Sequence, residues 1–278
     1  MTDNSPIHLH QRSAGHASAA FDLRDGRQRL ADLRQQGSAK AIMLDPGELV
    51  FLNTSGGLTG GDALSYRLDL GPGTRLTATT QTAERIYRST GPAARMGVRA
   101  HLGAGSHLDW LPQETILFDR AHAQRRTEIT LAEGATCLTC ETLVLGRAAM
   151  GETIAEIDFH DWRMIRRGDT PLHLEALRLD AARLADNPAG LGGARALATV
   201  VMIDPRAETV LDRLRAALAG LAADGTDGTA GAVRAAASAL PGRLVLRLMA
   251  ADGWPLRQAL ARILALLRGS PLPRVWQG

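Results

Sequence analysis

Residues 55–62 read SGGLTGGD, and glycine-rich runs of this kind can bind phosphate groups. A phosphate loop needs a lysine and then a serine or threonine after its last glycine, and a dinucleotide fingerprint needs a following helix. Here Asp62 comes next, and residues 64–70 alternate with the period of two that is typical of a half-buried strand. We therefore predict a tight structural turn between strands, built on Gly56, Gly57, Gly60 and Gly61.

Cys137 and Cys140 form a C-x-x-C pair, which could act in redox chemistry or supply half of a zinc site. Residues 136–144 have the pattern of a strand, in which positions three apart point to opposite faces. This favours two buried thiols that act as small hydrophobic residues. His8, His10 and His16 could bind a metal only weakly, and a solvated N-terminal segment is the simpler interpretation.

The composition sets the class of protein. The 278 residues are 45% hydrophobic but only 4% aromatic, so the core must consist mainly of aliphatic side chains. Lys40 is the only lysine among 32 basic residues, the net charge is +3, and no basic run is interleaved with aromatics, which argues against nucleic-acid binding. The sequence has no apolar stretch of about eighteen residues and no apolar signal region near its start, so we expect a cytoplasmic protein without a membrane span.

An internal repeat predicts the architecture. Units that start at Leu70, Leu102 and Leu131 each carry a glycine three residues later, and they recur about every thirty residues. Each unit reads as strand, glycine turn, strand, and no helical crossover pattern occurs between residues 60 and 180. We predict a mainly β protein, a two-layered β-coil or β-helix-like assembly of sheets with a few helices in the C-terminal part.

The same alignment superimposes polar positions of successive units. Stacked coils would bring these positions near one another, and they are Thr80, Gln81, Gln113, Glu114 and Glu141. They could form a functional polar row beside the sheet or a solvated face, and the solvated face is the more ordinary outcome.

The C-terminal part carries two helical patterns. Asp204-Pro205 provides an N-cap and a first-turn proline for a helix whose apolar face runs from Val210 to Leu221. A second helix is predicted from Pro255 to Leu267 with Gly269 after it, and residues 243–248 read as a strand between them. We predict one domain over 1–278, β-rich over 20–203 and helix-containing over 204–278.

Four segments in this order resemble the UreD (UreH) family of urease accessory proteins. They are residues 55–62 (SGGLTGGD), 79–89 (TTQTAERIYRS), 110–119 (WLPQETILFD) and 145–152 (LGRAAMGE). Residues 243–248 look like the last strand of the family's sequences, and residues 272–276 look like the Pro-x-x-Trp motif at their end. The pair Glu84-Arg85 departs from the family, in which a lysine is common before the following Ile-Tyr.

The resemblance implies a non-enzymatic assembly factor with a two-layered β-coil fold. Members of the family bind apo-urease and UreF, which recruits the GTPase UreG, and they help deliver nickel to urease through an internal passage. A passage must release Ni²⁺, so scattered oxygen ligands suit it better than a tight site, and we expect no tightly bound cofactor. The candidate passage residues are Asp62, Thr80, Glu114, Asp119, Glu141, Glu152 and Glu175.

Asp62 and Glu141 are the favoured members of this set, and each carboxylate could instead cap a turn or pair with arginine, as Glu152 could with Arg147. A different class of function stays open. Paired carboxylates on a β-coil scaffold could hydrolyse a glycosidic bond, although no aromatic platform for a sugar is visible.

Overall fold

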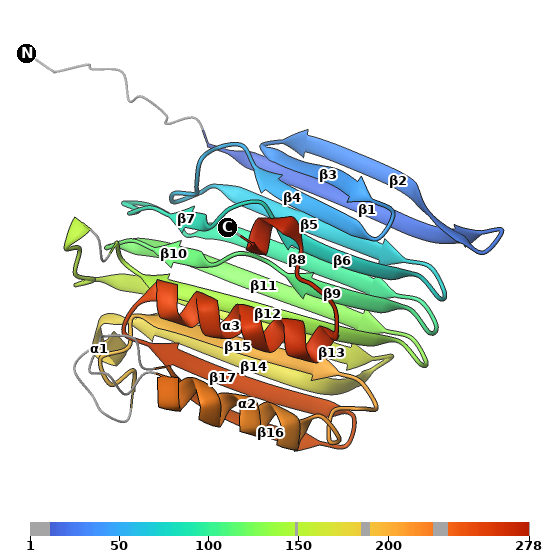
Figure 1. The fold of residues 1–278 in the computed structure, drawn as a ribbon. Helices are drawn as coiled ribbons and strands as arrows, with labels where there is room; N and C mark the ends of the chain where they lie inside the picture. Colours follow the sequence, from blue (N-terminus) through green and yellow to red (C-terminus); the bar gives the residue numbers. More distant parts are fainter. Residues whose placement is uncertain (1–11, 148–149, 185–189, 225–232, 278) are drawn as a thin grey trace, which may run out of the picture.

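The computed structural model describes residues 12–147, 150–184, 190–224 and 233–277, and it consists of two facing β-sheets with helices on one outer side (Figure 1). The mainly β, two-layered, coiled architecture predicted from the repeat is confirmed. No α-helix occurs in the described residues between 60 and 180, also as predicted.

The first sheet, sheet A, has seven strands in the order β14-β13-β11-β8-β5-β1-β2. In chain order these strands are β1 (Ala14–Arg24), β2 (Arg27–Gly37), β5 (Ala63–Leu70), β8 (Ala94–Leu102), β11 (Ala121–Leu131), β13 (Ile157–Arg167) and β14 (Thr170–Asp180).

The second sheet, sheet B, has ten strands. Eight of them lie in the order β16-β17-β15-β12-β9-β6-β4-β3, and the two short strands lie off this path, with β10 paired to β12 and β7 paired to β10. In chain order they are β3 (Ala39–Asp45), β4 (Glu48–Asn53), β6 (Arg75–Thr80), β7 (Glu84–Ile86), β9 (His107–Leu111), β10 (Thr115–Leu117), β12 (Thr136–Leu145), β15 (Ala196–Ile203), β16 (Arg234–Leu240) and β17 (Arg243–Ala250).

Each repeat unit is one coil that passes from sheet A through a glycine turn to sheet B. The turn glycines Gly73, Gly105 and Gly134 have φ of +70°, +65° and +67°, a backbone region that favours glycine. Gly73 N donates to Ala104 O at 2.9 Å, and Gly105 N donates to Glu133 O at 3.0 Å. These bonds join each turn to the next, so the coils stack in parallel and in register.

The core lies between the sheets and is built mainly from aliphatic side chains and alanine. Its aromatic part is a small cluster, in which Phe51 stacks on Tyr66 at 4.4 Å between ring centres and Trp110 meets Phe51 edge-on at 6.1 Å. Burying this apolar surface is the main force that holds the two sheets together.

Helices α2 (Leu211–Asp224) and α3 (Gly253–Arg268) cover the outer face of sheet B and form a second core with it (Figure 1). Asp252 caps α3 by accepting a hydrogen bond from Trp254 N at 2.9 Å, and Gly269 ends it at φ +68°. The predicted end is confirmed, and the helix starts two residues before Pro255.

The other helical prediction was wrong at its start. Residues after Asp204 form turns, and α2 begins only at Leu211. The Asp204 carboxylate accepts hydrogen bonds from the backbone and the guanidinium of Arg206, which holds the chain in this turn. The predicted strand over 243–248 is confirmed as part of β17.

The boundaries of the β-rich region also differ from the prediction. Strands begin at Ala14, the short helix α1 (Ala181–Leu184) interrupts the region, and β16 and β17 of the C-terminal part complete sheet B. The 3-10 turn η2 (Arg274–Trp276) closes the described chain, where Trp276 Nε1 donates to Leu111 O at 3.0 Å. Within the described residues, no helix is both long and apolar enough to cross a membrane.

Two glycines of one coil should differ in how much they matter for stability. A Cβ on Gly103 would lie 2.7 Å from Pro72 N of the preceding turn, whereas a Cβ on Gly105 meets nothing within 4 Å and is disfavoured only by its positive φ. We expect Gly105→Ala to lower the free energy of unfolding by about 1–2 kcal/mol and Gly103→Ala to lower it more. Urea unfolding of both variants checks this, and equal losses would contradict the packing of turn on turn.

Candidate functional site

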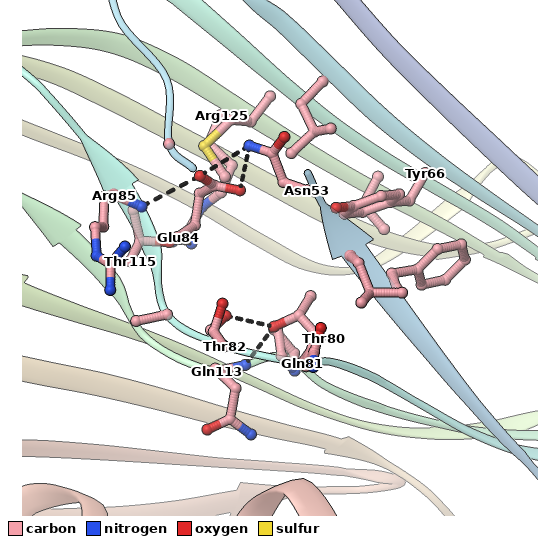
Figure 2. Close-up of a pocket in the computed structure, with 18 of the residues that line it drawn as sticks. Asn53, Tyr66, Thr80, Gln81, Thr82, Glu84, Arg85, Gln113, Thr115 and Arg125 are labelled. Carbon is pink, nitrogen blue, oxygen red and sulfur yellow. Dashed lines mark hydrogen bonds between the residues drawn. The ribbon is translucent and has the colours of Figure 1, made fainter. Parts of the chain in front are cut away.

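A pocket of about 210 Å³ opens between the two sheets near the turn that carries Gly56 and Gly57 (Figure 2). Side chains from both sheets line it, with Tyr66 from sheet A and Phe51 and Trp110 from sheet B forming its aromatic wall. Its polar lining residues include Asn53, Thr80, Gln81, Glu84, Gln113, Thr115, Arg125 and Glu141. The sequence had not shown this aromatic wall, because its rings come from three separate strands.

Glu84 is the acidic group near the outer part of the pocket. Asn53 Nδ2 donates to Glu84 Oε1 at 3.1 Å and to Oε2 at 3.2 Å, and Figure 2 shows the two side chains pointing toward each other. Burial raises the pKa of Glu84 to about 7, and the hydrogen bonds from Asn53 only partly oppose this effect. This carboxyl group therefore changes its charge close to neutral pH.

Glu141 lies on the inner wall of the pocket, where it is held by two donors. Trp110 Nε1 donates to Glu141 Oε1 at 3.2 Å, and Arg125 Nη1 lies 2.7 Å from Glu141 Oε2. Burial raises the pKa of Glu141, and the charge of Arg125 acts in the opposite direction.

Arg125 joins the two sheets through its guanidinium group. It is only 4% exposed, and it reaches from β11 of sheet A to Glu141 on β12 of sheet B. It also binds Asp161 on β13 with two hydrogen bonds, Nε to Oδ1 at 2.9 Å and Nη2 to Oδ2 at 2.6 Å. Burial disfavours ionisation of Asp161, but the charge and hydrogen bonds of Arg125 and the charge of Arg163 together outweigh that effect and lower the pKa of Asp161.

The ion pairs continue from Asp161 toward the far end of the sheets. Arg163 Nε lies 3.0 Å from Asp161 Oδ2, and Arg163 Nη1 lies 3.4 Å from Glu175 Oε2. We call this alternating set the charge row, and its members are Glu141, Arg125, Asp161, Arg163 and Glu175.

Glu175 forms the outer end of the charge row. His173 Nε2 lies 3.5 Å from Glu175 Oε2, and Arg247 Nη2 from β17 lies 3.3 Å from Oε1. Burial works against ionisation of Glu175, but the nearby His173 imidazole and the charges of Arg163 and Arg247 lower its pKa to about 2. A small cavity lined by Glu141, Arg163 and His173 lies along the row, so Glu141 contacts both the pocket and this inner space.

The structure brings together four of the repeat-aligned polar positions. Thr80, Gln81, Gln113 and Glu141 all line the pocket, and Gln113 N donates to Thr80 Oγ1 at 2.9 Å across two coils. Glu114 does not join them, since it lies 3.3 Å from Arg257 Nη1 of α3 on the helix side of sheet B. Whether Thr80 and Glu141 contact nickel stays a prediction.

Three other candidate carboxylates lie apart from the pocket. Asp62 accepts hydrogen bonds from Thr59 N at 2.8 Å and Ser13 N at 2.7 Å, so it caps the glycine-rich turn. Asp119 accepts from Ala155 N and Glu156 N, which lowers its pKa.

Glu152 lies 3.0 Å from Arg147 Nε, and Asp119 N donates to it at 3.3 Å. These contacts match the structural alternative that the sequence left open for the three carboxylates. Glu114, Glu141 and Glu175 are paired with arginines, so each of the candidate carboxylates has a partner among the described residues.

The glycine-rich segment forms the turn between β4 and β5. Gly56, Gly57 and Gly61 have φ of +78°, +139° and +84°. A Cβ on Gly57 or Gly60 would also come within 2.8 Å of a neighbouring backbone oxygen. Only glycine fits this turn without strain, and its position beside the pocket makes it part of the pocket rim.

The two cysteines are free, buried and on opposite faces of β12. Cys137 packs in the core between the sheets, and Cys140 packs under the helices. Burial raises the pKa of the Cys137 thiol to about 12, so it is not reactive at neutral pH. His8 and His10 lie outside the described residues, and His16 bonds to Ser65 Oγ through Nδ1 at 2.9 Å. No group of three or more His, Cys, Asp or Glu in the described ranges is arranged to hold a metal ion.

Fold and site together define a class of protein, a stacked-coil scaffold of two sheets with charged groups between them. Residues 13–277 match the family model described as UreD urease accessory protein. The chain is 52% identical over 273 residues to a urease accessory protein UreD of Cereibacter sphaeroides, with 96% of each chain covered. It is 48% identical over 279 residues to that of Paracoccus denitrificans, covering 98% of this chain and 95% of the relative. The chain belongs to the UreD family of urease accessory proteins, as its four motifs predicted.

Removing Arg125, one of the two cations of the charge row, should be costly. Arg125→Met leaves Glu141 and Asp161 buried without their partner, and we expect it to lower the free energy of unfolding by about 3–5 kcal/mol. Arg67→Met removes an exposed pair with Asp69 and should cost less than about 1 kcal/mol. Chemical denaturation measures both, and similar losses for the two variants would contradict the importance of burial.

Glu84 should make stability depend on pH in a defined direction. The pKa of Glu84 is about 7 in the folded protein, above its usual value of 4.5, so folding favours the protonated carboxyl group. The contribution of Glu84 to the free energy of unfolding is therefore complete below pH 4.5 and is lost as the pH rises through 7. Glu84→Gln should be close to neutral at low pH and should stabilise the protein by about 1–3 kcal/mol above pH 7. Unfolding measured across this range tests the prediction, and a pH-independent difference would count against it.

Proposed function

We propose that this protein acts in urease maturation as a non-catalytic scaffold. In this proposal it binds apo-urease and a UreF protein, which brings UreG, in the cytoplasm, and it passes Ni²⁺ through its interior to the urease active site. Membership of the UreD family supports the maturation role, and the names of the relatives support an accessory role.

The observation that carries the nickel part of the proposal is the line of polar groups between the sheets. It runs from Glu84 at the pocket through Glu141 to Glu175 on the last strand of sheet A. Such a line supplies carboxylate, hydroxyl and imidazole groups that can bind Ni²⁺ one after another. Because no tight cage is required, each step can release the ion to the next.

The charges of the row also suit transient binding. Arg125 already neutralises Glu141, so an arriving cation must compete with the guanidinium for the same oxygen. This competition weakens binding and favours release. The row therefore supports a passage for a divalent cation better than a storage site.

Glu141→Gln tests this function, because glutamine keeps the shape of the side chain and removes its charge. The chain, urease and the other accessory proteins are expressed together, and nickel per urease is measured with urease activity and copurification. We expect several-fold less nickel in urease with the complex intact, since the contact between pocket and inner cavity loses its anion.

Glu114→Gln is the matched control, because Glu114 belongs to the neighbouring coil but pairs with Arg257 on the helix side. It should leave nickel loading unchanged. Normal nickel content in Glu141→Gln with an intact complex would refute the passage, whereas loss of copurification in both variants would indicate a failure of assembly.

A further inference from the structure

The outer face of sheet A, opposite to the pocket, carries a shallow depression of about 520 Å³. It is centred on Gly97 of β8, which aligns with Ser65 on β5 and with Arg126 on β11. We call it the sheet-A depression, and its charged lining residues are Arg67, Arg95, Arg99, Arg126 and Glu128. None of these residues belongs to the charge row or to the pocket between the sheets.

Gly97 is not required by the backbone. Its φ is not positive, and an added Cβ would meet only Ser65 Cβ, at an ordinary contact distance of 3.8 Å. Glycine weakens the interior of a strand, and there it often marks a place where a ligand or another chain approaches closely. Glycine at position 97 therefore serves to leave open space above this face of the sheet.

The depression is strongly basic. Four arginines face one carboxylate, and Arg99 Nε and Arg126 Nη2 share that carboxylate, Glu128, at 3.2 and 2.8 Å. Arg67 pairs with Asp69 beside the depression. The Arg95 guanidinium makes no hydrogen bond or ion pair with any residue that the structure describes, so a positive charge is available for an incoming anion.

An apolar strip adjoins the basic part on the same face. Arg126 stacks over the Trp162 ring at 4.1 Å, and Trp162 aligns with Arg126 across β11 and β13. Met164 and Leu174 are paired in register beside it, and Leu174 is 57% exposed. Arginine, tryptophan and methionine together are typical of the centre of a protein interface.

We infer that the sheet-A depression binds an acidic segment of a partner protein, with a carboxylate above Gly97 between Arg95, Arg99 and Arg126 and an apolar side chain on the strip of Trp162, Met164 and Leu174. The inference does not depend on nickel passing through the interior. The partner is defined by its chemistry, as a chain in which acidic and apolar side chains alternate.

The test uses the full chain and a fluorescein-labelled peptide of alternating glutamate and leucine, with binding followed by fluorescence anisotropy. We expect this peptide to bind more tightly than a lysine–leucine peptide and a glutamate–serine peptide, and more weakly as salt is added. Gly97→Val fills the depression with a residue that suits a strand, so it should reduce the affinity about tenfold without lowering the melting temperature.

Arg95→Glu is the second variant and should also reduce the affinity at least about tenfold. Arg34→Glu is the matched control, since Arg34 lies exposed on β2 of the same sheet but outside the depression. It should change the affinity less than about twofold.

Each other outcome would overturn the inference. Equal binding of the glutamate and lysine peptides would show that the depression does not discriminate between negative and positive peptides. Unchanged binding by Gly97→Val and Arg95→Glu would show that the peptide binds elsewhere. Tighter binding of a single-stranded oligonucleotide that competes with the peptide would assign the surface to nucleic acid.

Discussion

The in-register stacking of parallel coils is the constraint on which the other features depend. The glycine turns fix it, because Gly73 and Gly105 each donate a backbone hydrogen bond to the turn of the next coil. Residues about thirty positions apart in the sequence then lie on neighbouring strands with their side chains on the same face. Thr80 and Gln113 meet at the pocket only for this reason.

Stacking also explains how the charge row can exist between the two sheets. Asp161 aligns with Arg125 across β11 and β13, and Arg163 with Glu175 across β13 and β14. Asp161 and Glu175 therefore each have a guanidinium within reach on the next strand or on their own, and Glu141 is reached by Arg125 from the opposite sheet. Without this alignment the same residues would be unpaired buried charges, which a fold of marginal stability could not accommodate.

Buried ion pairs are seldom the most stable filling for a core, because well-packed apolar residues of similar volume often serve as well or better. The charge row thus has no evident benefit for stability alone. Its continuity with the pocket through Glu141 is a property that apolar residues could not supply. This is the physical reason to connect the row with the movement of an ion.

The sequence was sufficient for the features that depend on local pattern. The Leu–Gly repeat predicted the stacked coils, the alternation around Cys137 and Cys140 predicted opposite faces, and Gly269 marked the end of α3. The start of α2 was missed, because the Asp204 side chain holds a turn with Arg206 that resembles a helix cap in sequence.

Only part of the candidate site could be predicted from the sequence, because pairing between strands that are far apart in the sequence determines which side chains line it. Gln113 lines the pocket and Glu114 does not, yet both side chains contact Arg257, which lies on a helix that the repeat does not include. Arg125, Asp161 and Arg163 were missed, although a signal existed. Each occupies an inward position of an alternating strand on which most other inward residues, such as Ile129 and Phe159, are apolar. A charge on an apolar face was the sign of a buried network.

The side chains of strand β8 alternate between the two faces of sheet A and line a different space on each face. Met96 and Val98 line the pocket between the sheets, and the alternating Arg95 and Arg99 line the depression on the outer face. Gly97 lines both and has no side chain, so only backbone separates the two spaces at this residue. Because side chains alternate, replacing an outer residue leaves the inner contacts in place, and the two surfaces can be altered independently. A partner bound outside would then lie one backbone layer from the polar interior without entering it.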